Sequence, residues 1–139
     1  ELGTGGGSEK SHAYDAKLDE EYRRRYLAWV KRCVDGETCI FVADAQDGPR
    51  RLDGYIFMLP EQLAFVWDAA VINEIFVRSE YRDTGLADRL LIRGLEHARK
   101  QALPLDRVVL DVDRTNSRAR AFYARHGFEH WGEMVAHPL

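Results

Sequence analysis

One stretch of this chain combines residue types that could bind a phosphate. Residues 77–91 read VRSEYRDTGLADRLL, where an apolar strand-like end passes through a polar loop directly into an amphipathic helix. The first N–H groups of a helix have no intrahelical acceptor, and the positive end of the helix dipole attracts anions. Gly85 lets a phosphate approach the backbone, and Arg82 adds positive charge. The stretch predicts a site for a phosphorylated cofactor, although on the loop alone a plain strand–turn–helix junction is an equally good interpretation.

The glycine pattern of the loop indicates which class of phosphorylated ligand it could bind. It lacks the Gly-Lys-Ser/Thr ending of a nucleoside triphosphate loop, and it has one glycine where a dinucleotide fingerprint needs three. Arg82-x-x-Gly85-x-Ala87 resembles instead the Q/R-x-x-G-x-G/A signature of the GNAT superfamily of N-acetyltransferases. Residues 116–128 resemble that family's N-x-x-A-x-x-x-Y pattern, followed by a glycine and an aromatic residue. Because both motifs occur in the family's order and separation, residues 38–128 are identified as similar to this superfamily.

The resemblance implies a fold and a cofactor. It implies an α/β protein with the GNAT-like acyl-CoA N-acyltransferase fold, in which helices flank a central, mostly antiparallel sheet. Acetyl-coenzyme A, the cosubstrate, would lie across the sheet with its pyrophosphate on the loop, and its pantetheine arm would pair with the preceding strand. A backbone N–H near Phe76 or Val77 would face the thioester oxygen. The implied cofactor-binding residues are Ile75, Phe76, Val77, Arg82, Asp83, Thr84, Gly85, Leu86, Ala87, Asp88, Asn116, Arg120 and Tyr123.

Two residues are predicted to carry out catalysis. Tyr123 stands at the family's position for the acid that protonates the departing thiolate, and a phenol with a pKa near ~10 keeps its proton at neutral pH. Glu74 occupies a position where relatives often carry an acidic residue, so we expect it to accept a proton from the amine, directly or through water. Without the resemblance, a core tyrosine and a solvent-facing glutamate are the alternative interpretations. Asp111, Asp113 and His130 are further candidates for the base.

Three kinds of polar residue near these motifs have expected roles of their own. Asn116 is expected to face the pantetheine arm or to cap the following helix, and both roles can hold together. Arg120 is the first choice among Arg118, Arg120 and Arg125 for the 3′-phosphate of coenzyme A, while a solvated helix face is the alternative. Asp83 brings a carboxylate where the family often has glycine, so only its backbone N–H can help to bind a pyrophosphate.

The elements that position these residues follow from the apolar periodicity. Residues 19–33 predict a helix, residues 38–43, 52–59 and 69–77 predict strands, and residues 46–49 predict a turn. A central helix ends before Pro104, a strand covers residues 107–113, a helix follows Asn116, and a last strand covers residues 129–136. The apolar face of the central helix comprises Leu86, Leu90, Leu91, Leu95, Ala98 and Ala102. This order indicates a mixed sheet with helices on its faces.

The chain of 139 residues is expected to form one domain. Residues 1–12 are polar and glycine-rich and are interpreted as a disordered arm or an expression remnant, which leaves residues 13–139 as a single GNAT-like acetyltransferase domain. Family members usually open with a strand and a helix, whereas no apolar strand-like run lies before Tyr14. Either the N-terminus is shortened, or another chain supplies the missing edge. Because proteins normally cover an exposed sheet edge, this gap favours a homodimer.

Composition and charge argue against several other classes of protein. The net charge of −3 gives no general attraction to nucleic acid or to an anionic membrane. No apolar run is long enough to span a bilayer, and no secretory signal is visible. Cys33 and Cys39 lack metal-ligand spacing, so we expect no metal and interpret them as free thiols of a cytoplasmic protein.

Three functions therefore stay open from the sequence. The preferred one is transfer of the acetyl group of acetyl-coenzyme A to the primary amine of a small molecule. The second is the same chemistry on a protein N-terminus or a lysine, which would need a groove for an extended peptide. The third is a non-catalytic acyl-coenzyme A binding module. The presence of Tyr123 and Glu74 favours catalysis over binding alone.

Overall fold

The computed structural model describes residues 19–44 and 51–139. The arm predicted at residues 1–12 and the turn predicted at residues 46–49 lie outside these residues. The segment before Tyr14, for which no strand is predicted, also lies outside them.

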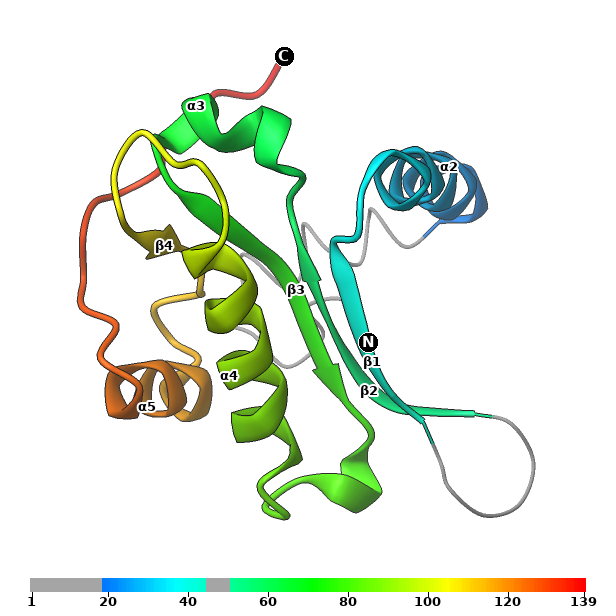
Figure 1. The fold of residues 1–139 in the computed structure, drawn as a ribbon, viewed down its shortest axis with the longest axis vertical. Helices are drawn as coiled ribbons and strands as arrows, with labels where there is room; N and C mark the ends of the chain where they lie inside the picture. Colours follow the sequence, from blue (N-terminus) through cyan, green and yellow to red (C-terminus); the bar gives the residue numbers. More distant parts are fainter. Residues whose placement is uncertain (1–18, 45–50) are drawn as a thin grey trace.

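Within the described part of the chain, four strands form one open sheet, and helices pack on both of its faces (Figure 1). The strand order is β1-β2-β3-β4, with antiparallel β1–β2 and β2–β3 pairs and a parallel β3–β4 pair. The predicted α/β class with a mostly antiparallel sheet is thereby confirmed. In chain order the elements are α2 (Glu20–Gly36), β1 (Ile40–Asp44), β2 (Leu52–Met58), η1 (Glu61–Leu63), α3 (Ala64–Trp67), β3 (Ala70–Val77), η2 (Ser79–Tyr81), α4 (Leu86–Arg99), β4 (Val108–Val109) and α5 (Ser117–Arg125).

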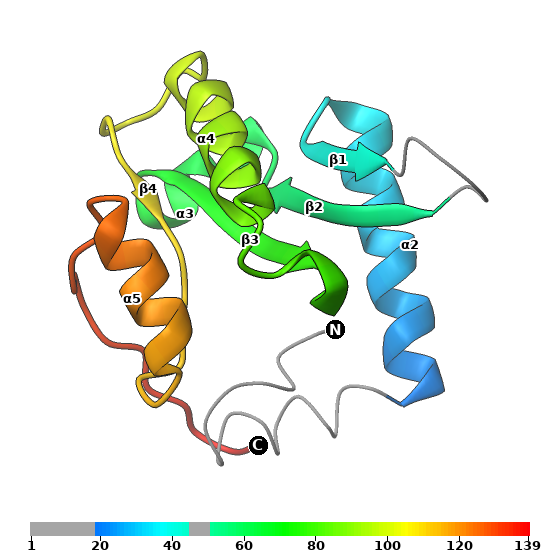
Figure 2. The same cartoon turned by 90° about the horizontal axis from the view of Figure 1, so that it is seen from below.

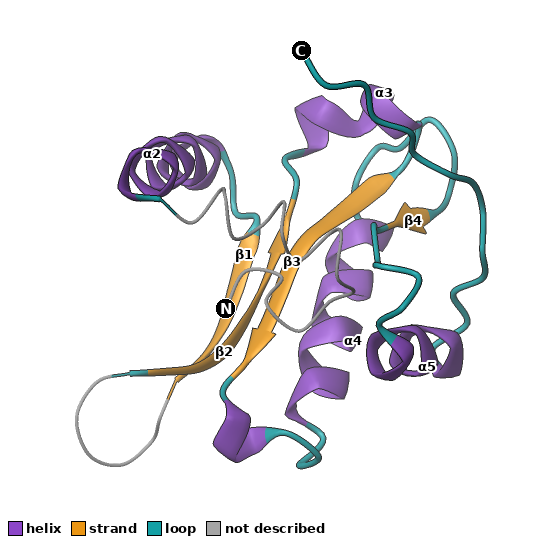
Figure 3. Cartoon of the chain, turned by 180° about the vertical axis from the view of Figure 1, so that it is seen from behind, coloured by secondary structure: helices purple, strands orange, loops and turns teal. Residues whose placement is uncertain are grey.

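The two faces of the sheet carry different helices. Helices α4 and α5 lie on one face and α2 lies on the other, as Figures 2 and 3 show from two further directions. On the α4 face, the buried cluster consists of Ile56, Met58, Ala70, Ile72, Leu86, Leu90, Leu91 and Ala98. On the α2 face, a smaller cluster of Cys33, Cys39 and Phe57 is covered by Trp29 and its neighbours. The sheet therefore separates two clusters of packed side chains, and candidate site residues lie on each of its faces.

Local signals set the ends of the helices. The Asp19 side chain accepts a hydrogen bond from the N–H of Tyr22 at 2.7 Å, so the first predicted helix begins at Glu20, one residue after its cap. Helix α4 ends at Arg99, and Ala102, predicted on its apolar face, lies beyond it and is exposed. None of the helices among the described residues is long and apolar enough to cross a lipid bilayer.

The structure differs from the predicted secondary structure in three places. Residues 129–136 do not form a strand: they have no regular secondary structure, and their side chains are exposed, Val135 by 94%. The strand predicted at residues 107–113 shortens to Val108–Val109, because only these two residues pair with β3. Two short helices at residues 61–67 follow Pro60 within an apolar run that gave no helical signal. Strands need a ladder partner, and an alternating pattern alone does not supply one.

Candidate active site

A bulge in β3 decides which way its side chains point. Phe57 pairs with Glu74 and Met58 pairs with Ile72, so Asn73 is an extra residue with no opposite partner on β2. Ile72 packs in the α4-side cluster, and so do Ile75 and Val77 beyond the bulge. Side chains alternate along a strand, and an extra residue reverses their phase. The bulge therefore turns Glu74 toward the α2 face, where Phe57 and Tyr55 lie.

Glu74 accepts hydrogen bonds from two tyrosines on that face. The Tyr26 hydroxyl of α2 donates to Oε1 at 2.9 Å, and the Tyr55 hydroxyl of β2 donates to Oε2 at 2.8 Å. Asn73 also donates, from Nδ2 to the Tyr26 hydroxyl at 3.3 Å. Burial and the neighbouring Glu74 raise the pKa of both phenols well above the ordinary value, so both remain donors. A carboxylate has about four acceptor positions, which leaves Glu74 able to accept further hydrogen bonds.

The edge of β3 that faces β4 is open along most of its length. Within the described residues, the parallel ladder joins only Ala70 to Val108 and Val71 to Val109. From Ile72 to Val77, this edge has no strand beside it in that ladder, although the other edge is paired with β2. An unpaired strand edge offers N–H and C=O groups to an extended molecule. The predicted main-chain contacts of Ile75, Phe76 and Val77 fall on this strand.

The loop after β3 enters α4 through two left-handed residues. Asp83 has φ 63° and Gly85, the N-cap residue, has φ 86° and ψ 0°. No side chain of the described residues caps the helix, so its first N–H groups have no side-chain acceptor there. A Cβ on Gly85 would meet nothing closer than Nη1 of Arg89 at 3.6 Å. Glycine is therefore required here by the backbone conformation rather than by lack of space.

Two carboxylates at this helix start are already paired with basic side chains from residues 118–126. Arg118 donates from Nη2 to Oδ1 of Asp83 at 3.1 Å. Arg125 and His126 reach Oδ1 of Asp88 at 2.7 Å and 2.6 Å. Chiefly through the bond from Arg125, these contacts hold the pKa of Asp88 below its usual value. The negative charges that would repel a pyrophosphate are thus paired within the protein.

Tyr123 lies on α5, on the same side of the sheet as α4. Its ring packs against the α4-side cluster and contacts Phe122 and Phe128 at centroid distances of 5.2 Å and 5.6 Å. Burial raises the pKa of the Tyr123 phenol to about 12. The hydroxyl therefore keeps its proton throughout the physiological range and is available as a donor.

Asn116 caps the helix that carries Tyr123. Its Oδ1 accepts a hydrogen bond from the N–H of Ala119 at 3.1 Å, which confirms the predicted cap. The amide nitrogen is not needed for this bond, so the predicted contact with a pantetheine arm stays compatible with capping.

The remaining residues that the sequence suggested for phosphate binding or for the base are described by their own contacts and exposure. Arg120 donates from Nη1 to the carbonyl oxygen of Arg114 at 2.9 Å, and its contact with a 3′-phosphate stays a prediction. Oδ1 of Asp113 accepts hydrogen bonds from the N–H and the hydroxyl of Thr115 at 2.8 Å and 2.7 Å, which gives it a local structural role. His130 lies in the exposed segment after α5, and Asp111 is also exposed.

The two predicted catalytic side chains lie on opposite faces of the sheet. Tyr123 packs with the α4-side cluster, and Glu74 is bonded to tyrosines on the α2 face. A single bound molecule could contact both only where the sheet is open, which is along β3 beyond Val71. This opening also lies beside the residues that lead into the loop and α4.

Sequence reasoning missed the residues that hold Glu74. Tyr26 was visible as part of a buried helix face, and Tyr55 as a strand residue, but neither was linked to Glu74. The available signal was the use of tyrosine and tryptophan at positions 22, 26 and 29, where a core helix would more often carry leucine. Aromatic residues with polar tips indicate a face that contains polar partners.

Comparison with known protein families agrees with the resemblance of the two sequence motifs. The model of the acetyltransferase (GNAT) family matches residues 8–128. A search of curated proteins found no match. Within the described residues, no group of three or more His, Cys, Asp or Glu side chains could hold a metal ion.

Solved structures share the fold at low sequence identity. PH1933 from Pyrococcus horikoshii is 24% identical, with a TM-score of 0.66 over 95% of this chain and 79% of that one. A putative acetyl transferase from Pyrococcus furiosus is 23% identical, with a TM-score of 0.64 over 86% and 78%. The PaiA N-acetyltransferase from Thermoplasma acidophilum, solved in complex with coenzyme A, is 19% identical, with a TM-score of 0.62 over 85% and 69%.

Proposed function

The chain belongs to the GNAT family of acetyltransferases, and from this premise we propose that it transfers the acetyl group of acetyl-coenzyme A to the primary amine of a small molecule. The observation that carries the proposal is the open edge of β3 beside the start of α4. One feature suits an extended arm, and the other suits a pyrophosphate. That a similar fold was solved with coenzyme A supports the choice of cosubstrate.

The residues at the helix start fit a pyrophosphate. The left-handed backbone at Asp83 and Gly85 opens the loop, and the N-cap glycine brings no side chain to the helix start. The carboxylate of Asp83 is paired with Arg118, and that of Asp88 is paired with Arg125. Neither carboxylate therefore repels a pyrophosphate as an unpaired negative charge. Each contact between a phosphate and such a helix end contributes about 0.3–1 kcal/mol when exposed.

The reaction forms a C–N bond and breaks a C–S bond. An acceptor that arrives as an ammonium loses two protons, one before it attacks and one as the C–S bond breaks. The departing sulfur takes one proton from an acid, and the second proton of the nitrogen restores that acid. Acetyl-coenzyme A supplies the activated acetyl group as a thioester. Glu74 would take the proton of the acceptor ammonium, directly or through a water molecule. Tyr123 would give its proton to the leaving sulfur, and the pKa of about 12 means that the phenol is fully protonated beforehand. A β3 backbone N–H near Phe76 would stabilise the developing oxyanion.

The test separates binding from chemistry. We expect acetyl-coenzyme A to be consumed in the presence of amines, and Tyr123→Phe to lower kcat by roughly 10- to 10⁴-fold, the range for loss of a general acid. Calorimetric titration should find coenzyme A affinity unchanged, because the substitution removes one hydroxyl and almost no volume. Full activity of the variant would show that another group or water protonates the sulfur.

We also propose that the protein acts in the cytoplasm as a homodimer. Cys33 and Cys39 are both unpaired and buried, as expected of thiols in a reducing compartment. Strand β1 pairs with β2 on one edge, and no described strand covers its other edge. A second copy could cover that edge, and the molar mass measured by light scattering tests this.

A further inference from the structure

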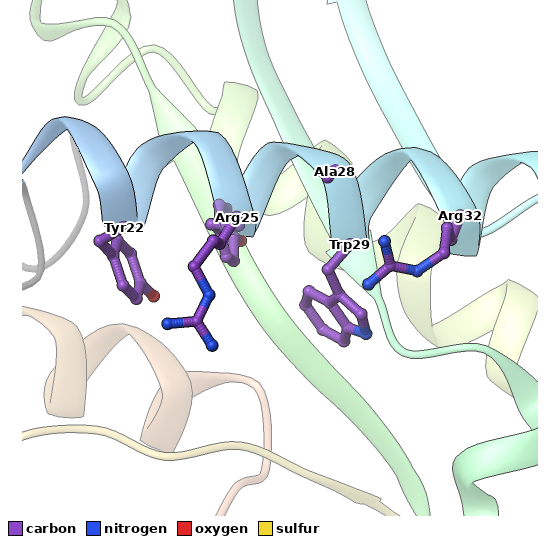
Figure 4. A pocket seen from close by; sticks show the side chains of 6 residues that line it. Tyr22, Arg25, Ala28, Trp29 and Arg32 are labelled. Carbon is purple, nitrogen blue, oxygen red and sulfur yellow. The ribbon is translucent and has the colours of Figure 1, made fainter.

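One side of α2 borders a hollow of about 550 Å³. Its lining consists of Tyr22, Arg25, Tyr26, Ala28, Trp29 and Arg32, and Figure 4 shows the long side chains projecting from one side of the helix. Trp29 contacts Phe57 of β2 at a centroid distance of 5.7 Å, and Tyr26 is bonded to Glu74 of β3. Two of the lining residues, Tyr26 and Trp29, therefore reach the sheet, and Tyr26 connects the hollow to the carboxylate of Glu74.

The lining combines flat aromatic surface with positive charge. Tyr22 and Tyr26 stack at 5.9 Å, and Tyr26 and Trp29 are also 5.9 Å apart, so three rings follow one another along the helix. Arg25 and Arg32 are seven residues apart, about two helical turns, and thus share a face. Both are exposed, and neither forms an ion pair with another described residue. Two guanidinium groups therefore border an apolar surface, and no carboxylate of the described residues neutralises them.

These arginines are poorly placed for the phosphates of coenzyme A. The loop and α4 lie on one face of the sheet, whereas α2 lies on the other (Figure 1). A ligand for Arg25 and Arg32 is therefore a different molecule, or a different part of the reaction, from the pyrophosphate. Glu74, bonded to the lining residue Tyr26, supplies a negative group next to the positively charged border.

We propose that this hollow binds the acceptor and that the acceptor is an amine which also carries a carboxylate, as an α-amino acid with an apolar side chain does. The inference rests on the proposed acetyl transfer. The ammonium group lies toward Glu74, the carboxylate pairs with Arg25 or Arg32, and the apolar body packs on Tyr22 and Trp29. Guanidinium groups suit carboxylates because they donate two parallel hydrogen bonds.

The same charges disfavour acceptors with several positive groups. A polyamine or an aminoglycoside would bring ammonium groups beside Arg25 and Arg32, and like charges placed together across an interface are costly. One negative side chain, Glu74, accepts one ammonium group. The hollow thus distinguishes a zwitterion from a polycation by its charge pattern alone.

Pairs of amines that differ only in the carboxylate test the proposal. The panel comprises phenylalanine with 2-phenylethylamine, tryptophan with tryptamine, leucine with isoamylamine, and spermidine as the polycation. We expect the carboxylated member to have the higher kcat/KM in the pair that reacts best, and spermidine to be a poor acceptor. A preference for the amine without a carboxylate, or for spermidine, would overturn the proposal.

Charge-reversal variants on α2 test whether Arg25 and Arg32 cause the preference for the carboxylated amine. Arg25→Glu and Arg32→Glu should each raise KM for the carboxylated amine by roughly three- to tenfold, a modest change because both guanidinium groups are exposed. KM for its carboxylate-free partner should not rise. Arg23→Glu, on the same helix but outside the hollow, has the same change in charge and should leave KM unaltered. Equal KM values in all three variants would refute the assignment.

A separate binding measurement distinguishes failure of this inference from failure of the proposed reaction. Ligand-observed NMR with the coenzyme A complex reports whether the carboxylated amines bind, even if none is acetylated. Binding that Arg25→Glu weakens, without turnover, would support the hollow and count against the proposed acetyl transfer. Turnover of other amines without binding of any carboxylated one would overturn the inference and leave the proposed function standing.

Discussion

Substitution of Gly85 is the sharpest test of the loop before α4. Its φ of 86° lies in the left-handed region, where a residue with a Cβ costs about 1–2 kcal/mol and a β-branched residue costs more. Gly127, after α5, has φ 89°, and a Cβ there would meet nothing within 4 Å. Gly85→Val and Gly127→Val therefore carry the same kind of backbone strain with little steric clash in the protein. We expect both to lower Tm by a similar amount, roughly 5–10 °C.

The two variants should differ in binding. In Gly85→Val, the new isopropyl group would stand among the N–H groups at the start of α4 and keep a phosphate from at least two of them. At about 0.3–1 kcal/mol for each contact, the affinity for acetyl-coenzyme A should fall by roughly three- to thirtyfold. Calorimetric titration at temperatures well below both Tm values measures this directly.

Either of two results would refute this reasoning. Wild-type affinity in Gly85→Val would mean that the helix start does not bind the pyrophosphate. An equal loss of affinity in Gly127→Val would mean that strain, and not access to the helix start, weakens binding. Loss confined to Gly85→Val would support the assignment.

Three further predictions concern single side chains. Glu74→Gln should lower kcat by about 10²- to 10⁴-fold, and a variant that keeps its kcat while Tm falls would leave Glu74 only a structural role as acceptor for the two tyrosines. The pKa of His97 is held below its ordinary 6.5, first by burial and then by Arg93, so the unfolded chain binds the proton more readily. The stability contributed by neutral His97 is therefore fully present above pH 6.5 and is lost as the pH falls below it. Thermal unfolding at about pH 7.5 and about pH 5.5 should show a smaller drop in His97→Gln than in wild type, and equal drops would contradict the assignment. Arg120→Gln should reduce the preference for coenzyme A over 3′-dephospho-coenzyme A, more at low than at high salt, and equal affinities of the wild-type protein for the two compounds would rule out a phosphate contact.

Local signals in the sequence were sufficient for most of the fold. The spacing of Leu86, Leu90 and Leu91 predicts the buried face of α4, and all three are buried. Asn116 predicts the start of α5 because a cap depends only on the next few residues. The loop residues of the candidate site belong to the same category, since a turn into a helix is determined over a short stretch of chain.

Long-range pairing explains what the sequence did not predict. The hydrogen bonds to Glu74 join residues 48 and 19 positions apart, and no local pattern encodes them. The apolar residues within 129–136 are compatible with a strand, but β4 pairs with β3 over two residues, and no described strand pairs with that segment. The extra residue at Asn73 is equally invisible, because a bulge is defined only by the register against β2.

The bulge at Asn73 also limits how this site could change over generations. A point substitution at position 74 alters the chemical group but leaves it on the α2 face. Deletion of Asn73 would remove the bulge but leave Glu74 opposite Phe57, on the α2 face. A one-residue slip of β3 against β2 would instead pair Glu74 with Ile56 and turn it toward α4. That slip would also carry Ile75 and Val77 out of the core cluster that they contact, so the carboxylate cannot change faces unless the core is exposed.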